Sequence, residues 1–108
     1  MIDKSKALTV FQISEDEYDE LLKEFLEQLE GRFSIIQAAV DSGDTATVGK
    51  EIHALKGVAG NMRLDDCYNA AVAIESATKA ADEASQRFWL SQLRRHVDEI
   101  RVSITPPQ

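Results

Sequence analysis

The sequence predicts an all-α protein, an antiparallel four-helix bundle with a short N-terminal helix or arm. Apolar residues recur at steps of three and four through most of the 108 residues, the spacing of helices that each bury one face. Helix-capping residues and short connections separate these stretches, and short connections favour antiparallel neighbours. No stretch has the alternating pattern of a strand. The whole chain, residues 1–108, is expected to form one domain.

The first part of the chain predicts a cap segment over residues 1–13, followed by a long helix. The four residues from Ser14 match a capping box, and Ile13 with Tyr18 supplies a hydrophobic staple across it. Gly43 stands at a plausible C′ position, where a glycine ends a helix. The apolar line of this helix comprises Tyr18, Leu22, Phe25, Leu29, Phe33, Ile36 and Val40, widened by Leu21, Leu26 and Ala39.

Acidic and hydroxyl side chains mark the starts of the next three helices. Asp44 is placed to cap the second helix, and Asp65 or Asp66 to cap the third. Asp82 and Ser85 are alternative starts for the last helix. The connections between these helices are therefore expected to be short turns.

The predicted bundle occupies residues 14–104, and residues 105–108 form a tail. The apolar lines of its last three helices are Val48, Ile52, Leu55, Ala59 and Met62; then Cys67, Ala70, Ala71, Ile74 and Ala77; then Trp89, Leu93, Val97 and Ile100, flanked by Phe88 and Leu90. The third helix is rich in alanine, so its neighbours can approach closely.

The composition excludes several classes of function. The 12 basic and 19 acidic residues give a net charge of −7, so we expect no nucleic-acid partner and no binding to anionic membranes. The single Cys67 cannot form an internal disulfide and fits a reducing compartment, where it would act as a small buried hydrophobe. No apolar run approaches the roughly 20 residues of a membrane span. A cytoplasmic monomer without membrane insertion is therefore predicted.

A second line of residues on the second helix carries the candidate chemistry. Gly49, His53, Lys56, Gly57 and Gly60 share a face beside the apolar line. Helical side chains lean toward the N-terminus, so a side chain at position 57 would overhang position 53, and Gly57 leaves the imidazole uncovered. Lys56 lies one turn after His53 and can bring a cation close to whatever the ring carries. An uncovered histidine beside a cation suits phosphate.

The run His53-Ala54-Leu55-Lys56-Gly57, continued by Ala59, Gly60 and Asn61, resembles the signature of histidine-containing phosphotransfer (HPt) domains. The resemblance covers nearly the whole chain, since such domains are helical bundles of about this length. It implies a phosphorelay intermediate, in which His53 accepts a phosphoryl group from a receiver-domain aspartate and passes it to another. Response-regulator receiver domains and a hybrid sensor histidine kinase are then the expected partners.

The resemblance also implies that the receiver domain brings the aspartate, the Mg²⁺ and most of the catalysis. The chain would be a phosphoryl carrier rather than an independent enzyme, and no metal or cofactor is expected to bind to it. The expected site residues are His53 as the phosphorylated group, with Lys56, Gly57, Gly60 and Gly49 supporting the phosphate, and Asn61 and Arg63 in partner docking.

Arg63 departs from the family pattern, because the family usually has a small residue, most often Gly, at this position. If the helix continues that far, the arginine lies about 15 Å along the axis from His53, at about 1.5 Å per residue. It should therefore meet a receiver surface or the start of the next helix, where Asp65 and Asp66 are potential partners, rather than the phosphate.

The residues also leave alternatives open. The domain could be a non-catalytic helical-bundle interaction module that binds a signalling partner through the same face, with its glycines allowing close helix packing. It could also be a piece of a larger hybrid sensor kinase, although Met1 and the short tails favour a free-standing protein. The acidic stretch 15–30 is expected to be a solvated face, with an acidic docking surface as the alternative. His96 is expected to be solvated or to complement the helix dipole.

Overall fold

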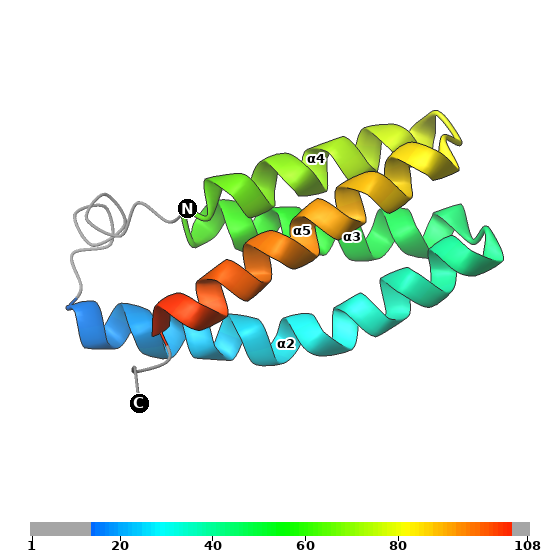
Figure 1. The fold of residues 1–108 in the computed structure, drawn as a ribbon. Helices are drawn as coiled ribbons and strands as arrows, with labels where there is room; N and C mark the ends of the chain where they lie inside the picture. Colours follow the sequence, from blue (N-terminus) through cyan, green and yellow to red (C-terminus); the bar gives the residue numbers. More distant parts are fainter. Residues whose placement is uncertain (1–13, 105–108) are drawn as a thin grey trace.

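The computed structural model describes residues 14–104, and these residues form an antiparallel helical bundle. Its helices are α2 (Glu15–Ser42), α3 (Thr45–Asn61), α4 (Asp65–Lys79) and α5 (Glu83–Ile104). Figure 1 shows α4 and α2 on opposite sides of the bundle, with α5 running diagonally between them. The connections span only residues 43–44, 62–64 and 80–82. The all-α fold is therefore confirmed, whereas the predicted cap segment 1–13, including Ile13, and the tail 105–108 lie outside the described residues.

The predicted capping box begins α2. The backbone N–H of Glu17 donates to the Ser14 hydroxyl (3.1 Å), and the backbone N–H of Ser14 donates to the Glu17 carboxylate (3.2 Å). One turn later, Tyr18 is fully buried and its hydroxyl donates to the carbonyl of Met62 (2.8 Å). This bond ties the start of α2 to the end of α3, the helix that carries the candidate site.

The core consists mainly of the predicted apolar lines, with three exceptions. Phe88 was predicted to flank the α5 line, but it is 54% exposed. Leu21 was expected to widen the buried stripe of α2, but it lies on the surface. Trp89 was placed in the core line of α5, but 36% of it is exposed and its ring packs edge-on against Phe88. The buried line starts instead at Leu90 and continues through Leu93, Val97 and Ile100. This line keeps steps of three and four, and Trp89 stands about 100° away from Leu90 around the helix.

The caps of the last two helices differ from each other. Asp82 caps α5, because its carboxylate accepts hydrogen bonds from the backbone N–H (3.1 Å) and hydroxyl (2.7 Å) of Ser85. The expectation that Asp65 or Asp66 caps α4 is wrong, since Leu64 occupies the N-cap position without a side-chain hydrogen bond. Both aspartates lie in the first turn of α4, where their charges complement the helix dipole.

Left-handed residues follow the ends of α2, α3 and α4. Gly43 has φ 74°, as the prediction of a C′ glycine requires, but Arg63 (φ 59°) and Ala81 (φ 54°) adopt the same conformation with a side chain. At α3 the N–H of Arg63 donates to the Gly60 carbonyl (3.2 Å) and that of Leu64 to the Ala59 carbonyl (2.9 Å). This pattern is a Schellman motif.

The Schellman motif explains why a glycine suits position 63. Because α3 ends at Asn61, the assumption that the helix continues to Arg63 is wrong. The side chain instead projects from a left-handed turn, which costs an L-residue about 1–2 kcal/mol. A glycine would remove this cost, so the departure at Arg63 affects local backbone strain.

We expect Ala81→Gly and Arg63→Gly each to raise the free energy of unfolding by roughly 0.5–1 kcal/mol. The gain is the relief of the left-handed conformation, less the roughly 0.4–1 kcal/mol that a glycine's added freedom gives the unfolded chain. Ala80→Gly is the matched control, because Ala80 is also exposed but has φ −84°. It should lower stability by roughly 0.5–1 kcal/mol. Chemical denaturation measures all three, and the same sign for Ala80→Gly and Ala81→Gly would contradict the argument.

Candidate functional site

His53 projects from the middle of α3 into solvent. Its side chain is 75% exposed, whereas Ile52 and Leu55 on either side of it are buried in the core. The helix is therefore held by its apolar line while the imidazole stays accessible. The imidazole therefore lies outside the buried core.

The glycines of α3 have two different surroundings. A Cβ added at Gly49 or at Gly57 would meet nothing within 4 Å, so neither glycine is required for close packing. A Cβ at Gly60 would lie 3.4 Å from the ring of Tyr68 on α4. Gly57, one turn after His53, therefore leaves the imidazole uncovered. Gly49, one turn before His53, also faces open space, whereas Gly60 lies against the Tyr68 ring of α4.

Lys56 is held by a carboxylate from the neighbouring helix. Its ammonium lies 3.0 Å from Oε1 of Glu75 on α4, and only 24% of the lysine side chain is exposed. The other oxygen, Oε2, lies 3.6 Å from Nδ1 of His53. The role of Lys56 in supporting a phosphate stays a prediction, and its charge is paired with Glu75 in this state.

Glu75 is the site residue that sequence reasoning missed. Its hydrogen bond from Lys56 lowers the pKa of the Glu75 carboxyl, with a further contribution from His53 and against the opposing effect of desolvation. The carboxylate is therefore ionised at neutral pH. Glu75 lies on a different helix from His53, and no spacing within α3 could reveal it.

The carboxylate position favours one tautomer of His53. A carboxylate facing Nδ1 favours a proton on that nitrogen, as it does in other carboxylate–imidazole pairs. Nε2 then carries the free lone pair. In this arrangement Nε2 can act as the nucleophile, while Nδ1 faces the negative charge of the Glu75 carboxylate.

The surface beside His53 contains both apolar and polar residues. Tyr68 and Val72 are exposed on α4, four residues apart on one face, and the Tyr68 ring lies against Gly60. Asn61 and Arg63 are exposed at the end of α3. Within residues 14–104, no group of three or more His, Cys, Asp or Glu side chains could hold a metal ion.

Two other candidates from the sequence lie away from His53. His96 was expected to be solvated or to complement the helix dipole; it is not solvated, because its side chain is only 18% exposed and its Nδ1 lies 3.7 Å from Glu99 and 3.9 Å from Asp66. Cys67 is buried as expected, and burial raises the pKa of its thiol to about 12. Neither side chain belongs to the candidate site.

Comparison with known families shows to which family the chain belongs. A family model described as the Hpt domain matches residues 20–103. The chain belongs to the Hpt domain family. Histidine phosphotransfer in a phosphorelay is the role of this family, and the Hpt chain described here has that role.

The helical arrangement also matches a solved structure. The crystal structure of histidine-containing phosphotransfer protein B (HptB) from Pseudomonas aeruginosa PAO1 is similar, with a TM-score of 0.83 and 22% sequence identity over 95% of this chain and 90% of that chain. At this identity the match supports the fold. A search of curated proteins gave no match to the Hpt chain. Between residues 14 and 104, none of its helices is long and apolar enough to cross a membrane.

Proposed function

We propose that His53 is the residue that carries the phosphoryl group, accepting it from the aspartate of one receiver domain and passing it to that of another. The observation that carries this proposal is the exposed imidazole with Gly57 one turn later and Glu75 at Nδ1. The exposure admits a partner's active site. The carboxylate favours the tautomer whose Nε2 can attack.

The transfer step follows from this arrangement. The Nε2 lone pair of His53 attacks the phosphorus of an aspartyl phosphate, and the bond from phosphorus to the carboxylate oxygen breaks as the carboxylate leaves. The ring gains positive charge as the N–P bond forms, and Glu75 opposite Nδ1 stabilises that charge. The return step to a second aspartate is the reverse of the same reaction.

Lys56 can change partner during this step. Its ammonium is bound to Glu75 in the free domain at 3.0 Å, and it lies one turn from His53. When a phosphoryl group arrives on Nε2, its oxygens offer the ammonium a second anionic partner, while Glu75 gains a positively charged ring. Glu75 and Lys56 therefore pair with each other while His53 is free, and each gains a contact with the phosphorylated His53.

We further propose that the chain acts as a carrier whose partners supply most of the catalysis. From the family resemblance, we expect the receiver domain to supply the aspartate and Mg²⁺, and a hybrid sensor histidine kinase to act upstream of it. Tyr68 and Val72, with Asn61 and Arg63, offer exposed surface around the helix end for docking such a receiver. That the protein is a monomer and is located in the cytoplasm stays a prediction.

Label transfer from a phosphorylated receiver domain tests the proposal. The protein should acquire label that is stable in alkali and labile in acid, as expected for phosphohistidine, and should pass it to a second receiver. Labelling that is stable in acid would contradict a phosphohistidine. Tight receiver binding without any labelling would favour the alternative of a non-catalytic interaction module.

Lys56→Ala should slow transfer from a receiver by about tenfold, the effect of losing roughly 1.4 kcal/mol of charge stabilisation at the transferred group. Lys56→Arg is the matched control, because it keeps a cation beside the Glu75 carboxylate, and it should retain most of the rate. Stopped-flow or quenched transfer assays measure both, with circular dichroism as the folding control. An unchanged rate in Lys56→Ala would exclude a role for the amine.

A further inference from the structure

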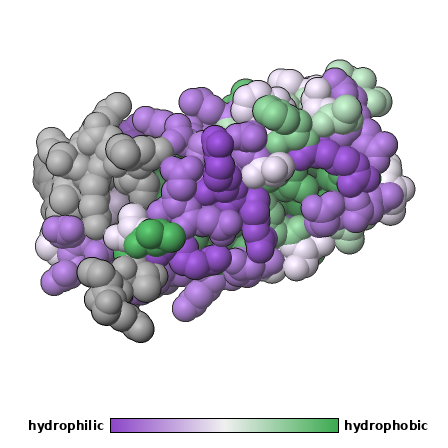
Figure 2. All heavy atoms as spheres, in the orientation of Figure 1, coloured by the Kyte–Doolittle hydropathy of each residue, from purple (hydrophilic) through white to green (hydrophobic). Residues whose placement is uncertain are grey.

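A groove opens between α2 and α5, away from the phosphotransfer site. Its volume is about 730 Å³, within the range of small-molecule pockets of about 300–1,000 Å³. The groove is lined by Glu30, Phe33, Ser34, Gln37, Ala38, Asp41, Arg87, Leu90, Ser91 and Arg94. None of these residues belongs to α3 or α4. Figure 2 shows hydrophobic surface between α5 and the C-terminal half of α2, bordered by hydrophilic residues.

Three arginines on α5 face α2 at intervals of seven residues. Arg87 lies 2.7 Å from the carboxylate of Asp41, and Arg101 pairs with Glu30. These two ion pairs join the helices on either side of the groove. Arg94 lies between them and pairs with no carboxylate in residues 14–104; its guanidinium stands 5.0 Å from the centre of the Phe33 ring.

The register explains why Arg94 has no acidic partner on the described part of α2. Moving seven residues forward from Arg87 on α5, and seven back from Asp41 on the antiparallel α2, brings Arg94 opposite Ser34. The Ser34 hydroxyl donates to the backbone carbonyl of Glu30 (3.4 Å) within its own helix. The position that would complete a ladder of ion pairs therefore holds a neutral residue.

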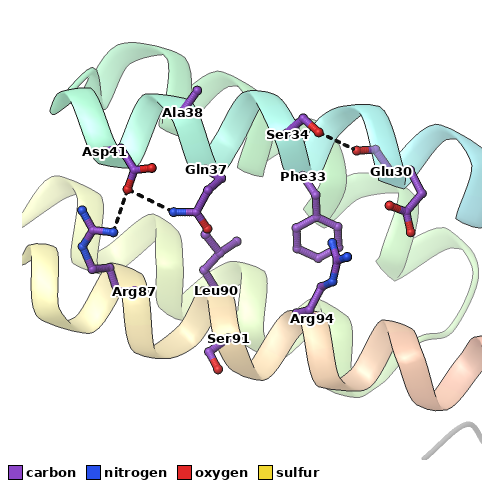
Figure 3. Close-up of a pocket in the computed structure, with 10 residues that line it drawn as sticks. All are labelled: Glu30, Phe33, Ser34, Gln37, Ala38, Asp41, Arg87, Leu90, Ser91 and Arg94. Atoms are coloured by element: carbon purple, nitrogen blue, oxygen red, sulfur yellow. Dashed lines mark hydrogen bonds and ion pairs between the residues drawn. The ribbon is translucent and has the colours of Figure 1, made fainter.

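Figure 3 shows how these groups converge. The Phe33 ring points down from α2, and the Arg94 side chain rises from α5 beside it, with Leu90 further along the floor. Gln37 and Arg87 both bond to Asp41, so their polar groups are already paired. Among residues 14–104, Arg94 is thus a positive charge of the groove without an acidic partner, and it lies beside Phe33 and Leu90, which are 6% and 5% exposed.

We propose that this groove binds a small amphipathic anion, with its carboxylate or phosphate on Arg94 and its apolar part on the floor over the edges of Phe33 and Leu90 and the aliphatic part of Gln37. A guanidinium binds either oxyanion by charge-assisted hydrogen bonds. The ring already stacks on the guanidinium and holds it in place, which lowers the entropy that binding must remove. The site is independent of the phosphotransfer site on α3.

Titration followed by backbone amide NMR tests the proposal with four probes. Phenylacetate and phenyl phosphate carry both a charge and an apolar ring; inorganic phosphate and benzyl alcohol each carry only one of these. We expect saturable shifts in α2 and α5 around Phe33, Gln37 and Ser91, at millimolar or tighter affinity, for at least one of the first two. Which of these two binds more tightly identifies the preferred oxyanion. Each of the last two should bind at least about tenfold more weakly.

Substitutions at the groove make the test specific. Arg94→Gln removes the charge and should weaken binding by about tenfold or more, whereas Arg95→Gln, the neighbouring exposed arginine outside the groove, should leave it unchanged. Ser34→Glu supplies the missing carboxylate and should also abolish binding, although it keeps Arg94. Shifts confined to α3 and α4, or affinities that both variants leave unchanged, would overturn the proposal.

Discussion

Replacing His53 by glutamine is expected to abolish phosphoryl acceptance from every donor. The amide nitrogen of glutamine is not a nucleophile, so position 53 of the variant carries no group that can attack the phosphorus. The side chain is 75% exposed, so the fold should not depend on it. Incubation with a labelled receiver domain, followed by separation of the two proteins, measures the loss.

The other histidine of the chain provides the control. His96 is mostly buried near Asp66 and Glu99, so His96→Gln can change stability but should keep full labelling in the folded protein. Circular dichroism shows whether each variant is folded. Persistent alkali-stable label on the His53→Gln protein would mean that another residue accepts the phosphoryl group.

The helices could be predicted because their signals are local. The capping box at Ser14 and the glycine at position 43 are satisfied by backbone groups within a few residues, and the structure shows both. The N-cap position of Leu64 and the exposure of Trp89 depend on contacts beyond such local signals. Leu64 takes the N-cap position of α4 as the residue after the left-handed Arg63, and two adjacent aspartates could not indicate this.

The candidate site could be predicted only in part, for the same reason. His53 was found because its exposure follows from its own helix and from Gly57 one turn later. Glu75 reaches the site from α4, and its identity depends on how α3 and α4 pack. A pattern within one helix could not show that Lys56 is already paired.

The glycine line illustrates how one pattern can contain two roles. The sequence pattern puts Gly57 and Gly60 on one face of α3 and predicted that both support the phosphate. The Tyr68 ring of α4 lies at contact distance from a Cβ at position 60, whereas position 57 faces open space. A large side chain at position 57 meets no atom of α4 at its Cβ, and this makes Gly57 the position at which to test the accessibility of His53.

Gly57→Leu is expected to slow transfer between the domain and a receiver by about a hundredfold, the scale of a reacting group displaced by about 1 Å. The leucine side chain should lean toward the N-terminus and cover the imidazole four residues earlier. The free domain should become more stable by about 0.8 kcal/mol, because leucine favours a helix more than glycine and a Cβ at this position meets nothing within 4 Å. Loss of transfer and gain of stability would then occur in the same protein.

Gly49→Leu is the matched control for this experiment. Position 49 is also open to a Cβ and lies four residues before His53, so a leucine there should give a similar gain in stability. Its side chain should lean away from the imidazole, and transfer should be unchanged. Quenched-flow transfer rates and denaturation curves on both variants decide the matter. Equal rates for Gly57→Leu and Gly49→Leu would mean that the imidazole does not need the clearance that Gly57 provides, and the glycine would then need another explanation.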